Sequence, residues 1–368
     1  MNILQLVSSS RTSGAEKHVA VLSERLRQRG HNVTAVCPHG DWLPQQLRTA
    51  QINTIEMDMR GVRAFATPLN LAKYVREHGV DIIHAHLTRA TYYALVTGRI
   101  AHLPLVTSVH CRSHDVAYRY LFPRDNSKIV SVSDFIRNGL LRKGVAEERI
   151  RTIYNGTEFL TDESGSAETA VDDMSALPVR AELSLPADAE LIGLIGRVDE
   201  FKGHLVLARA VQAIVQARPR AYFVLVGPAI PEIQKSMWEI TSAAGVADRL
   251  RFTGVRNDVK RLMSEMDLLT LPSRYEACSM SIIEGMAMGK PVIATRAGGN
   301  PELIEHGITG MLIERTPEDL ANAVVGLLAD QDRLQTMGAA AKTRAVERFS
   351  ARVMVDNIEK LYQEILGR

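Results

Sequence analysis

The chain has 368 residues, enough for two or three domains of about 150 residues that each bury a core of their own. Hydrophobic residues make up 46% and charged residues 23%, a globular composition that excludes a largely disordered chain. No apolar stretch reaches the roughly 18 residues of a membrane-spanning helix, and the N-terminus lacks the pattern of a signal peptide, so we expect a cytoplasmic protein. Three cysteines without close spacing exclude a disulfide framework and a zinc ribbon.

The net charge of +2 conceals an uneven distribution along the chain. Residues 1–160 contain 21 Lys and Arg and 13 Asp and Glu, a balance of +8, whereas the remainder contains 23 and 29, a balance of −6. A basic first half favours an anionic partner, either a phosphate-bearing substrate or the inner face of the plasma membrane as a peripheral contact, and we expect no nucleic acid. Arginines that merely solvate helix faces are the alternative explanation.

Apolar strands alternate with helical segments through the first 160 residues. The first predicted strand, 3–7, leads through a serine-rich loop into a helix over 16–29, and Ser13 and Glu16 have the spacing of a capping box. Further apolar runs predict strands at 33–37, 81–86, 105–109 and 128–132. Strands separated by helices indicate a parallel sheet with helices on both faces.

A polar segment interrupts this alternation over residues 160–190, where we place the interdomain linker. The alternation resumes with predicted strands at 191–195, 222–226, 268–271 and 291–294. The sequence therefore predicts a second α/β domain. An amphipathic helix over 353–365 ends the chain and could pack on either domain.

Two cations follow the first strand of the second predicted domain. Arg197 and Lys202 lie five positions apart in a glycine-flanked turn directly after residue 195. Ligands of open parallel sheets bind beyond the carboxyl ends of the strands, and cations in such a turn can grip and neutralise a diphosphate. A pair of solvated surface cations is the alternative.

Two carboxylates, Glu276 and Glu284, flank the predicted start of a helix near residues 279–281. The backbone N–H groups of such a helix start can bind an anion or a hydroxyl. Because carboxylates accept hydrogen bonds from hydroxyls, the pair could hold two sugar rings of one nucleotide-sugar. The alternative is that Glu276 only stabilises the helix dipole and that Glu284 is exposed.

The first predicted helix and the histidines of the first half provide further candidates. Gly14 leaves room for a phosphate beside the helix start, although the loop lacks GxGxxG and the chain lacks GxxxxGK[ST]. A zinc site at His84, His86, His110 and His114 is conceivable, but no acidic residue completes a metallohydrolase pattern, so we expect no metal. We expect His110 to face the ligand as a neutral hydrogen-bond donor.

Taken together, these motifs resemble those of a retaining GT-B glycosyltransferase of family 4. The resemblance covers nearly the whole chain, and it rests on the order and spacing of short motifs. These are SGAEK at 13–17, DIIHAH at 81–86, VTSVH at 106–110, YNG at 154–156, GR at 196–197 with KG at 202–203, FTG at 252–254, and the glutamates at 276 and 284. Many members carry two adjacent glycines before the first helix and a glycine-rich segment after the first carboxylate, where this chain has Ser13-Gly14 and Ala277-Cys278-Ser279.

The resemblance implies a GT-B architecture, in which two Rossmann-like, doubly wound domains face each other across a cleft. Residues 1–165 would bind the acceptor, residues 185–349 would bind the donor, and the C-terminal helix 350–368 would return to the first domain. The implied reaction moves a hexose-type sugar from a nucleoside-diphosphate sugar, with uridine diphosphate the expected carrier, to a hydroxyl acceptor with retention of configuration. It needs no metal or other cofactor. The acceptor can be a lipid-linked saccharide, and the reaction would be a step in the synthesis of a polysaccharide, a lipopolysaccharide or a glycolipid.

The resemblance also implies residue roles. Arg197 and Lys202 would hold the diphosphate, and Glu284 the ribose hydroxyls. Glu276 and the backbone of Cys278, Ser279 and Met280 would bind the transferred sugar, and His110 would lie in the cleft beside this sugar. Gly14 would lie near the distal phosphate. Val255 and Arg256 would border the base.

The sequence also allows two other interpretations of the function. An epimerase of nucleotide-sugars, or a phosphorylase, could share the architecture and would need a different acid–base set. A non-catalytic sugar-binding or phosphate-binding protein could also share it, because a fold does not determine a function.

Overall fold

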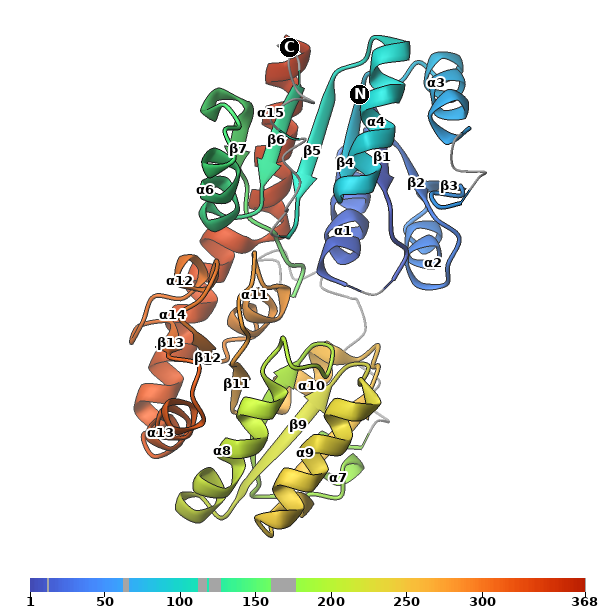
Figure 1. Ribbon diagram of the computed structural model, residues 1–368. Helices are drawn as coiled ribbons and strands as arrows, with labels where there is room; N and C mark the ends of the chain where they lie inside the picture. Colours follow the sequence, from blue (N-terminus) through green and yellow to red (C-terminus); the bar gives the residue numbers. More distant parts are fainter. Residues whose placement is uncertain (12, 62–65, 112–117, 119–126, 160–176, 368) are drawn as a thin grey trace. The chain divides into compact units, whose positions relative to one another are not determined.

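The computed structural model describes residues 1–11, 13–61, 66–111, 118, 127–159 and 177–367. The chain divides into two compact units, Met1–Gly156 with Phe349–Arg368, and Thr157–Arg348. Each unit contains one parallel sheet with helices between the strands, which confirms the predicted α/β fold (Figure 1). Of residues 160–190, to which the sequence assigns the linker, 160–176 lie outside the described residues, and 177–190 belong to the second unit and include a short helix.

The first unit is built on a seven-stranded sheet in the order β3-β2-β1-β4-β5-β6-β7. Its strands are β1 (Asn2–Val7), β2 (Asn32–Cys37), β3 (Asn53–Glu56), β4 (Ile82–His86), β5 (Leu105–Val109), β6 (Ser127–Ser131) and β7 (Ile150–Thr152). Its helices are α1 (Gly14–Gln28), α2 (Trp42–Thr49), α3 (Thr67–Glu77), α4 (Thr88–Ala101), α6 (Asp134–Arg142), the short 3-10 helix η2 (Glu147–Arg149) and α15 (Ala351–Leu366).

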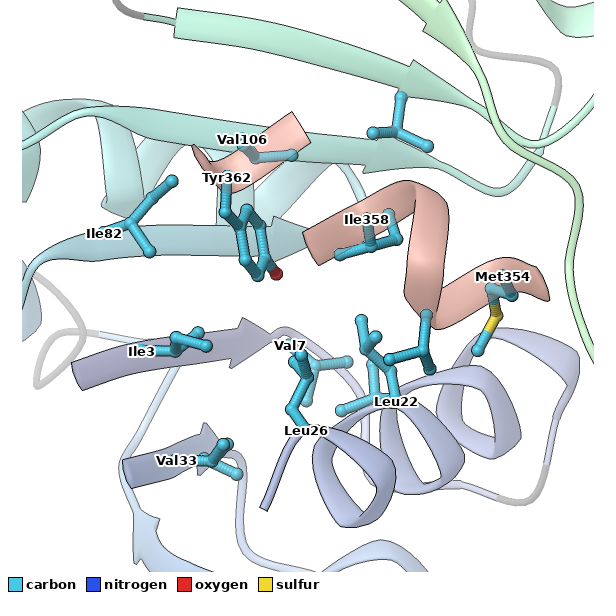
Figure 2. Close-up of a cluster of buried hydrophobic side chains, with 14 of the residues drawn as sticks. Ile3, Val7, Leu22, Leu26, Val33, Ile82, Val106, Met354, Ile358 and Tyr362 are labelled. Carbon is cyan, nitrogen blue, oxygen red and sulfur yellow. The ribbon is translucent and has the colours of Figure 1, made fainter. Parts of the chain in front are cut away.

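The core on one face of this sheet joins residues from both ends of the chain. Ile3 and Val7 of β1 lie among Leu22 of α1 and Ile358 of α15, all at most 1% exposed (Figure 2). Alternate residues of a strand point to the same face, so β1 contributes every second side chain to this core. The C-terminal helix therefore belongs to the first unit.

Helix α15 has clear sequence signals at both ends. The side chain of Ser350 accepts a hydrogen bond from the backbone N–H of Val353 at the start, and Gly367 ends the helix with a left-handed φ of 68°. By contrast, the capping box predicted for α1 does not form. The hydroxyl of Ser13 donates to the carboxylate of Glu16 and makes no capping hydrogen bond to the helix backbone.

The second unit is built on a six-stranded sheet in the order β10-β9-β8-β11-β12-β13. Its strands are β8 (Glu190–Ile195), β9 (Ala221–Val226), β10 (Leu250–Gly254), β11 (Leu268–Leu271), β12 (Val292–Thr295) and β13 (Gly310–Ile313). Its helices are α7 (Val179–Glu182), α8 (His204–Ala217), α9 (Pro231–Ala243), the 3-10 helix η3 (Ala247–Arg249), α10 (Val259–Glu265), α11 (Met280–Ala287), α12 (Asn300–Leu303), α13 (Pro317–Leu328) and α14 (Gln331–Phe349), the last of which leads into the first unit.

Candidate functional site

A buried aspartate organises the turn between β8 and α8. Asp199 is 4% exposed, and one of its carboxylate oxygens accepts a hydrogen bond of 2.7 Å from the backbone N–H of Lys202. Its other oxygen accepts from the Nε of Arg197, also at 2.7 Å. The guanidinium of Arg197 stays 61% exposed, so it is oriented by Asp199 and still accessible to a ligand. Sequence analysis missed this role of Asp199.

A glycine allows this turn to lie close to the next segment. Gly203 has a φ of 85°, and a Cβ built on it would lie 1.9 Å from the carbonyl oxygen of Pro272. Side chains are excluded there by both the backbone conformation and the space. The close approach brings the turn that carries Lys202 next to the segment that follows β11.

That neighbouring segment carries Glu276, which contacts Lys202 directly. The Nζ of Lys202 lies 2.8 Å from the Oε1 of Glu276, and the carboxylate side chain is only 10% exposed. The backbone of Glu276 is fixed as well, because its carbonyl oxygen accepts from the N–H of Gly299 at 2.8 Å. A Cβ on Gly298 would lie 2.1 Å from the same oxygen. The structure thus brings together a cation and a carboxylate that are 74 residues apart.

Helix α11 begins where the sequence predicted, with Ser279 as its N-cap. The hydroxyl of Ser279 is buried without a hydrogen-bond partner among the described residues, and it does not cap the helix. Ser281 ties the helix start to β8, because its hydroxyl donates to the carbonyl oxygen of Ile195 at 2.8 Å. The uncapped first turn offers backbone N–H groups and a hydroxyl to an anion or a sugar.

Three other predicted residues surround this helix start. Cys278 and Met280 are 8% exposed, on either side of the N-cap. Glu284 is the fifth residue of α11 and only 2% exposed, so the alternative in which it is a solvated surface residue is wrong. A buried carboxylate near the carboxyl edge of the sheet is suited to hold hydroxyl donors.

Val255 and Arg256 follow β10, at the same carboxyl edge of the sheet. Val255 is 62% exposed. The guanidinium of Arg256 is occupied by carboxylates, with Nε and Nη2 each 2.7 Å from Asp258 and Nη1 2.6 Å from Glu182. The hydrogen bonds from Arg256 hold the pKa of Asp258 far below its usual range. A nucleotide base would therefore meet the backbone and the valine here more readily than the arginine head group.

In the first unit, four histidines gather at the carboxyl ends of β4 and β5. His84 and His86, two positions apart in β4, project from one face of the strand, with ring centroids 4.2 Å apart. The ring of His110 stacks at 5.5 Å from that of His86, and the ring of His18, from α1, lies 4.7 Å from that of His110. His18 was missed by sequence analysis, and His114 lies outside the described residues.

Burial keeps these imidazoles neutral. Desolvation lowers the pKa of His18 to about 4, with Asn155 opposing the shift, and it holds the pKa values of His84, His86 and His110 well below 6.5. The neutral state predicted for His110 agrees with this environment.

One ring nitrogen from each of His18, His86 and His110 lies within 4.8 Å of the other two, which raises the question of a metal. Both nitrogens of His86 already make hydrogen bonds, Nε2 with Gln5 at 2.7 Å and Nδ1 with Nε2 of His110 at 3.2 Å. A metal ion would have to break at least one of these bonds. The two ring nitrogens of His86 are thus part of a hydrogen-bonded network that also includes Gln5 and His110.

Gly14 is the first residue of α1, in the same unit. The hydroxyl of Ser13 bonds to the carboxylate of Glu16, so it does not cap the N–H groups of the first helical turn. The backbone at Gly14 is therefore suited to accept an anion, as the sequence suggested.

Two family models match the chain. "Glycosyltransferase Family 4" matches residues 12–159, and "Glycosyl transferases group 1" matches residues 189–330. The matches cover most of both units. They define the protein as a glycosyltransferase of the GT-B type.

Individual proteins agree with these matches. A D-inositol 3-phosphate glycosyltransferase of Corynebacterium jeikeium is 24% identical over 96% of this chain and 92% of its own. An Escherichia coli UDP-Gal:alpha-D-GlcNAc-diphosphoundecaprenol alpha-1,3-galactosyltransferase is 22% identical over 96% and 94%. The Anabaena protein HepE, solved in complex with UDP and glucose, superposes with a TM-score of 0.85 at 26% identity, covering 99% of this chain and 100% of HepE. The chain belongs to glycosyltransferase family 4.

None of the helices in the described ranges is both long and apolar enough to cross a membrane.

Proposed function

We propose that the protein transfers a hexose from a uridine-diphosphate sugar to a hydroxyl acceptor, with retention of the anomeric configuration and without a cofactor. The single observation that carries this proposal is the arrangement of Arg197, Lys202 and Glu276 with the start of α11 in the second unit. Cations and free helix N–H groups complement a diphosphate, and the adjacent carboxylate complements sugar hydroxyls. The complex of HepE with UDP and glucose supports the choice of donor.

In this reaction the bond between the anomeric carbon and the oxygen of the β-phosphate breaks, and both electrons stay with the diphosphate. Arg197, Lys202 and the first turn of α11 stabilise the negative charge that develops there. The acceptor oxygen forms the new bond to the anomeric carbon on the face that the diphosphate leaves. The proton of the acceptor hydroxyl passes to the departing phosphate oxygen, so charge and atoms balance without an enzyme nucleophile.

Two glutamates and the start of α11 bind the ribose and the transferred sugar of the donor in this proposal. Glu284 would bind the ribose hydroxyls, and Glu276 with the backbone from Cys278 to Met280 would bind the hydroxyls of the transferred sugar. Burial of both carboxylates supports these roles, because a buried carboxylate gains most from a hydrogen-bond donor that replaces water.

A pocket in the first unit supports an amphiphilic acceptor. It has a volume of about 480 Å³ and is lined by Met59, Arg60, Gly61, Pro68, Arg89, Tyr92, Tyr93 and Val96. The lining contains two arginines and no acidic residue among the described ones, and two of its members, Tyr92 and Val96, are 38% and 44% exposed. Positive charge next to exposed apolar surface fits a phosphate-bearing, lipid-linked saccharide at an anionic membrane.

The donor is tested by measuring binding and turnover separately. Thermal shift with UDP-glucose, UDP-galactose and UDP-N-acetylglucosamine identifies the donor, because a ligand of the native state raises stability by mass action. Release of UDP with and without candidate acceptors then measures hydrolysis and transfer, and NMR of the product gives its anomeric configuration. Inversion at the anomeric carbon would contradict retention. An isomerised nucleotide-sugar would indicate an epimerase, sugar-phosphate formation a phosphorylase, and binding without turnover a non-catalytic protein.

The acceptor side is tested with vesicles. We expect the full chain to bind vesicles that contain phosphatidylglycerol, to lose binding at high salt, and to bind neutral phosphatidylcholine vesicles weakly. Arg60→Glu and Arg89→Glu should weaken binding without changing the affinity for UDP. Binding that is independent of anionic lipid and salt would contradict this part of the proposal.

A further inference from the structure

A chain of buried hydrogen bonds crosses the apolar core of the first unit. It joins, in this order, Ser108, His84, Tyr362, Gln5, His86 and His110. All but His110 have exposed fractions of 0%. Buried polar groups are less favourable than apolar ones unless each is paired, so a polar row inside this core calls for a physical explanation.

The sheet register and the C-terminal helix bring these groups together. Gln5 of β1 is paired in register with His84 of β4, so both point to the same face of the sheet. Ile3 and Ile82 point to that face as well and belong to the apolar core. Tyr362 reaches this core from α15 (Figure 2), and its hydroxyl lies between the polar groups of the two strands.

The amide of Gln5 sets the direction of the hydrogen bonds. Its nitrogen donates to the hydroxyl of Tyr362 at 3.3 Å, and its oxygen lies 2.7 Å from the Nε2 of His86. Tyr362 therefore gives its own proton to the Nδ1 of His84, 2.5 Å away, and the Nε2 of His86 must carry a proton. The Nδ1 of His86 is left as an acceptor.

This direction determines the protonation of His110. Its Nε2 lies 3.2 Å from the Nδ1 of His86, so Nε2 carries the proton and Nδ1 holds a lone pair. The Nδ1 of His110 is buried without a hydrogen-bond partner among the described residues. A buried acceptor without a donor is unfavourable, and a ligand hydroxyl would satisfy it.

We propose that the hydrogen bonds from Tyr362 through Gln5 and His86 fix the tautomer of His110, so that its Nδ1 accepts a hydrogen bond from a substrate hydroxyl. Tyr362 and Gln5 are then positioning residues. This revises the role expected from the sequence, in which His110 is a donor. The identity of the substrate rests on the proposed function, whereas the tautomer does not. If the oxygen of the Gln5 amide faced Tyr362 and its nitrogen faced His86, each hydrogen bond would run in the opposite direction. The Nδ1 of His110 would then carry the proton and act as a donor.

The tautomer is measurable in the full-length protein without any turnover. Long-range ¹H–¹⁵N NMR of protein labelled at histidine distinguishes protonated from unprotonated ring nitrogens, and His110→Gln assigns the signals. We expect a protonated Nε2 and an unprotonated Nδ1 in the wild type. Tyr362→Phe and Gln5→Leu should each give a mixture of both tautomers. Ile358→Ala, which removes apolar contacts of α15 from the same core, should leave the wild-type tautomer.

Kinetics provide the second readout. If the proposal holds, kcat falls in proportion to the fraction of His110 in the wrong tautomer, and the KM of UDP-glucose changes by less than about twofold. Gln5→Glu should retain most of kcat, because its carboxylate can accept from both Tyr362 and His86. If kcat falls as far in Ile358→Ala as in Tyr362→Phe, the role is merely structural and the proposal is overturned.

The tautomer also gives a result that is independent of activity. A protonated Nδ1 in the wild type, or an unchanged tautomer in both Tyr362→Phe and Gln5→Leu, would overturn the proposal. The proposed function fails differently, through a wild-type protein that neither binds nor turns over a UDP-sugar. The two failures are therefore distinguishable.

Discussion

The ammonium group of Lys202 and the carboxylate of Glu276 form an ion pair in the second unit, with the Nζ 2.8 Å from the Oε1. The side chains are 22% and 10% exposed, so solvent screens the pair only partly. In the proposed function, an arriving diphosphate competes with Glu276 for Lys202. The carboxylate that is released then becomes available to the hydroxyls of the transferred sugar.

This exchange predicts different binding defects for the two residues. Lys202→Ala should weaken the binding of both UDP and UDP-glucose, because both carry the diphosphate. Glu276→Gln should weaken UDP-glucose and leave UDP unchanged or bound more tightly, because Lys202 no longer has a carboxylate partner. Isothermal titration measures all four affinities, and an equal loss for UDP and UDP-glucose in Glu276→Gln would contradict the assignment.

Arg197 should matter for the reaction and little for the fold. Removal of one group that stabilises developing charge typically costs about 10²–10³ in rate, so we expect Arg197→Ala to lower kcat/KM by about that factor. Its guanidinium is 61% exposed, and the free energy of unfolding should change by less than about 1 kcal/mol. Arg220→Ala, which alters an arginine that is 57% exposed before β9, is the matched control. Unchanged turnover in Arg197→Ala would remove the main support for the donor site.

The turn at Gly203 should tolerate no side chain. Gly203→Ala combines an unfavourable φ of 85° with a Cβ only 1.9 Å from the carbonyl oxygen of Pro272. Gly30→Ala is a matched control, because its φ is 84° and nothing lies within 4 Å of the added Cβ. We expect about 1 kcal/mol of destabilisation for Gly30→Ala and at least about 2 kcal/mol more for Gly203→Ala, measured by urea unfolding. Equal effects would show that the close approach to Pro272 does not constrain the turn.

The central strands of both sheets were predictable, and the edge strands were not. Every strand that the sequence analysis missed, β3, β7, β10 and β13, lies at an edge of its sheet. An edge strand is covered less completely, and β3 and β7 accordingly have no fully buried residue. The sequences of β3 and β7 therefore lack the continuous apolar run that identifies a buried parallel strand, whereas β13 was missed although most of its residues are apolar and buried.

The candidate site shows the same division between local and distant signals. Arg197 and Lys202 could be found because cations after a strand are a local pattern, and Asp199 between them carried a signal that was overlooked. Tyr362 could not be found in this way. Its hydroxyl bonds to Gln5, which lies 357 positions away in the sequence. The helical spacing of apolar residues in α15 makes Tyr362 look like an ordinary core residue.

Stability should fall as the pH decreases from about 6.5 towards 4, because buried histidines are neutral in the folded protein. Burial lowers the pKa of His18 and of His204 to about 4, whereas an exposed histidine of the unfolded chain has a pKa of 6.5. Between these values the unfolded chain binds protons that the folded protein does not. The stabilisation is therefore complete above pH 6.5 and is lost as the pH falls through this window.

Urea unfolding at a series of pH values measures this loss as a slope of the free energy of unfolding against pH. His204→Gln removes one of the contributing groups, so the slope between pH 6.5 and 4 should become shallower even if the variant is less stable at neutral pH. His102→Asn changes an exposed histidine with a left-handed backbone at the end of α4, and it should keep the wild-type slope. A wild-type slope in His204→Gln would mean that this imidazole takes up its proton in the folded protein as readily as in the unfolded chain.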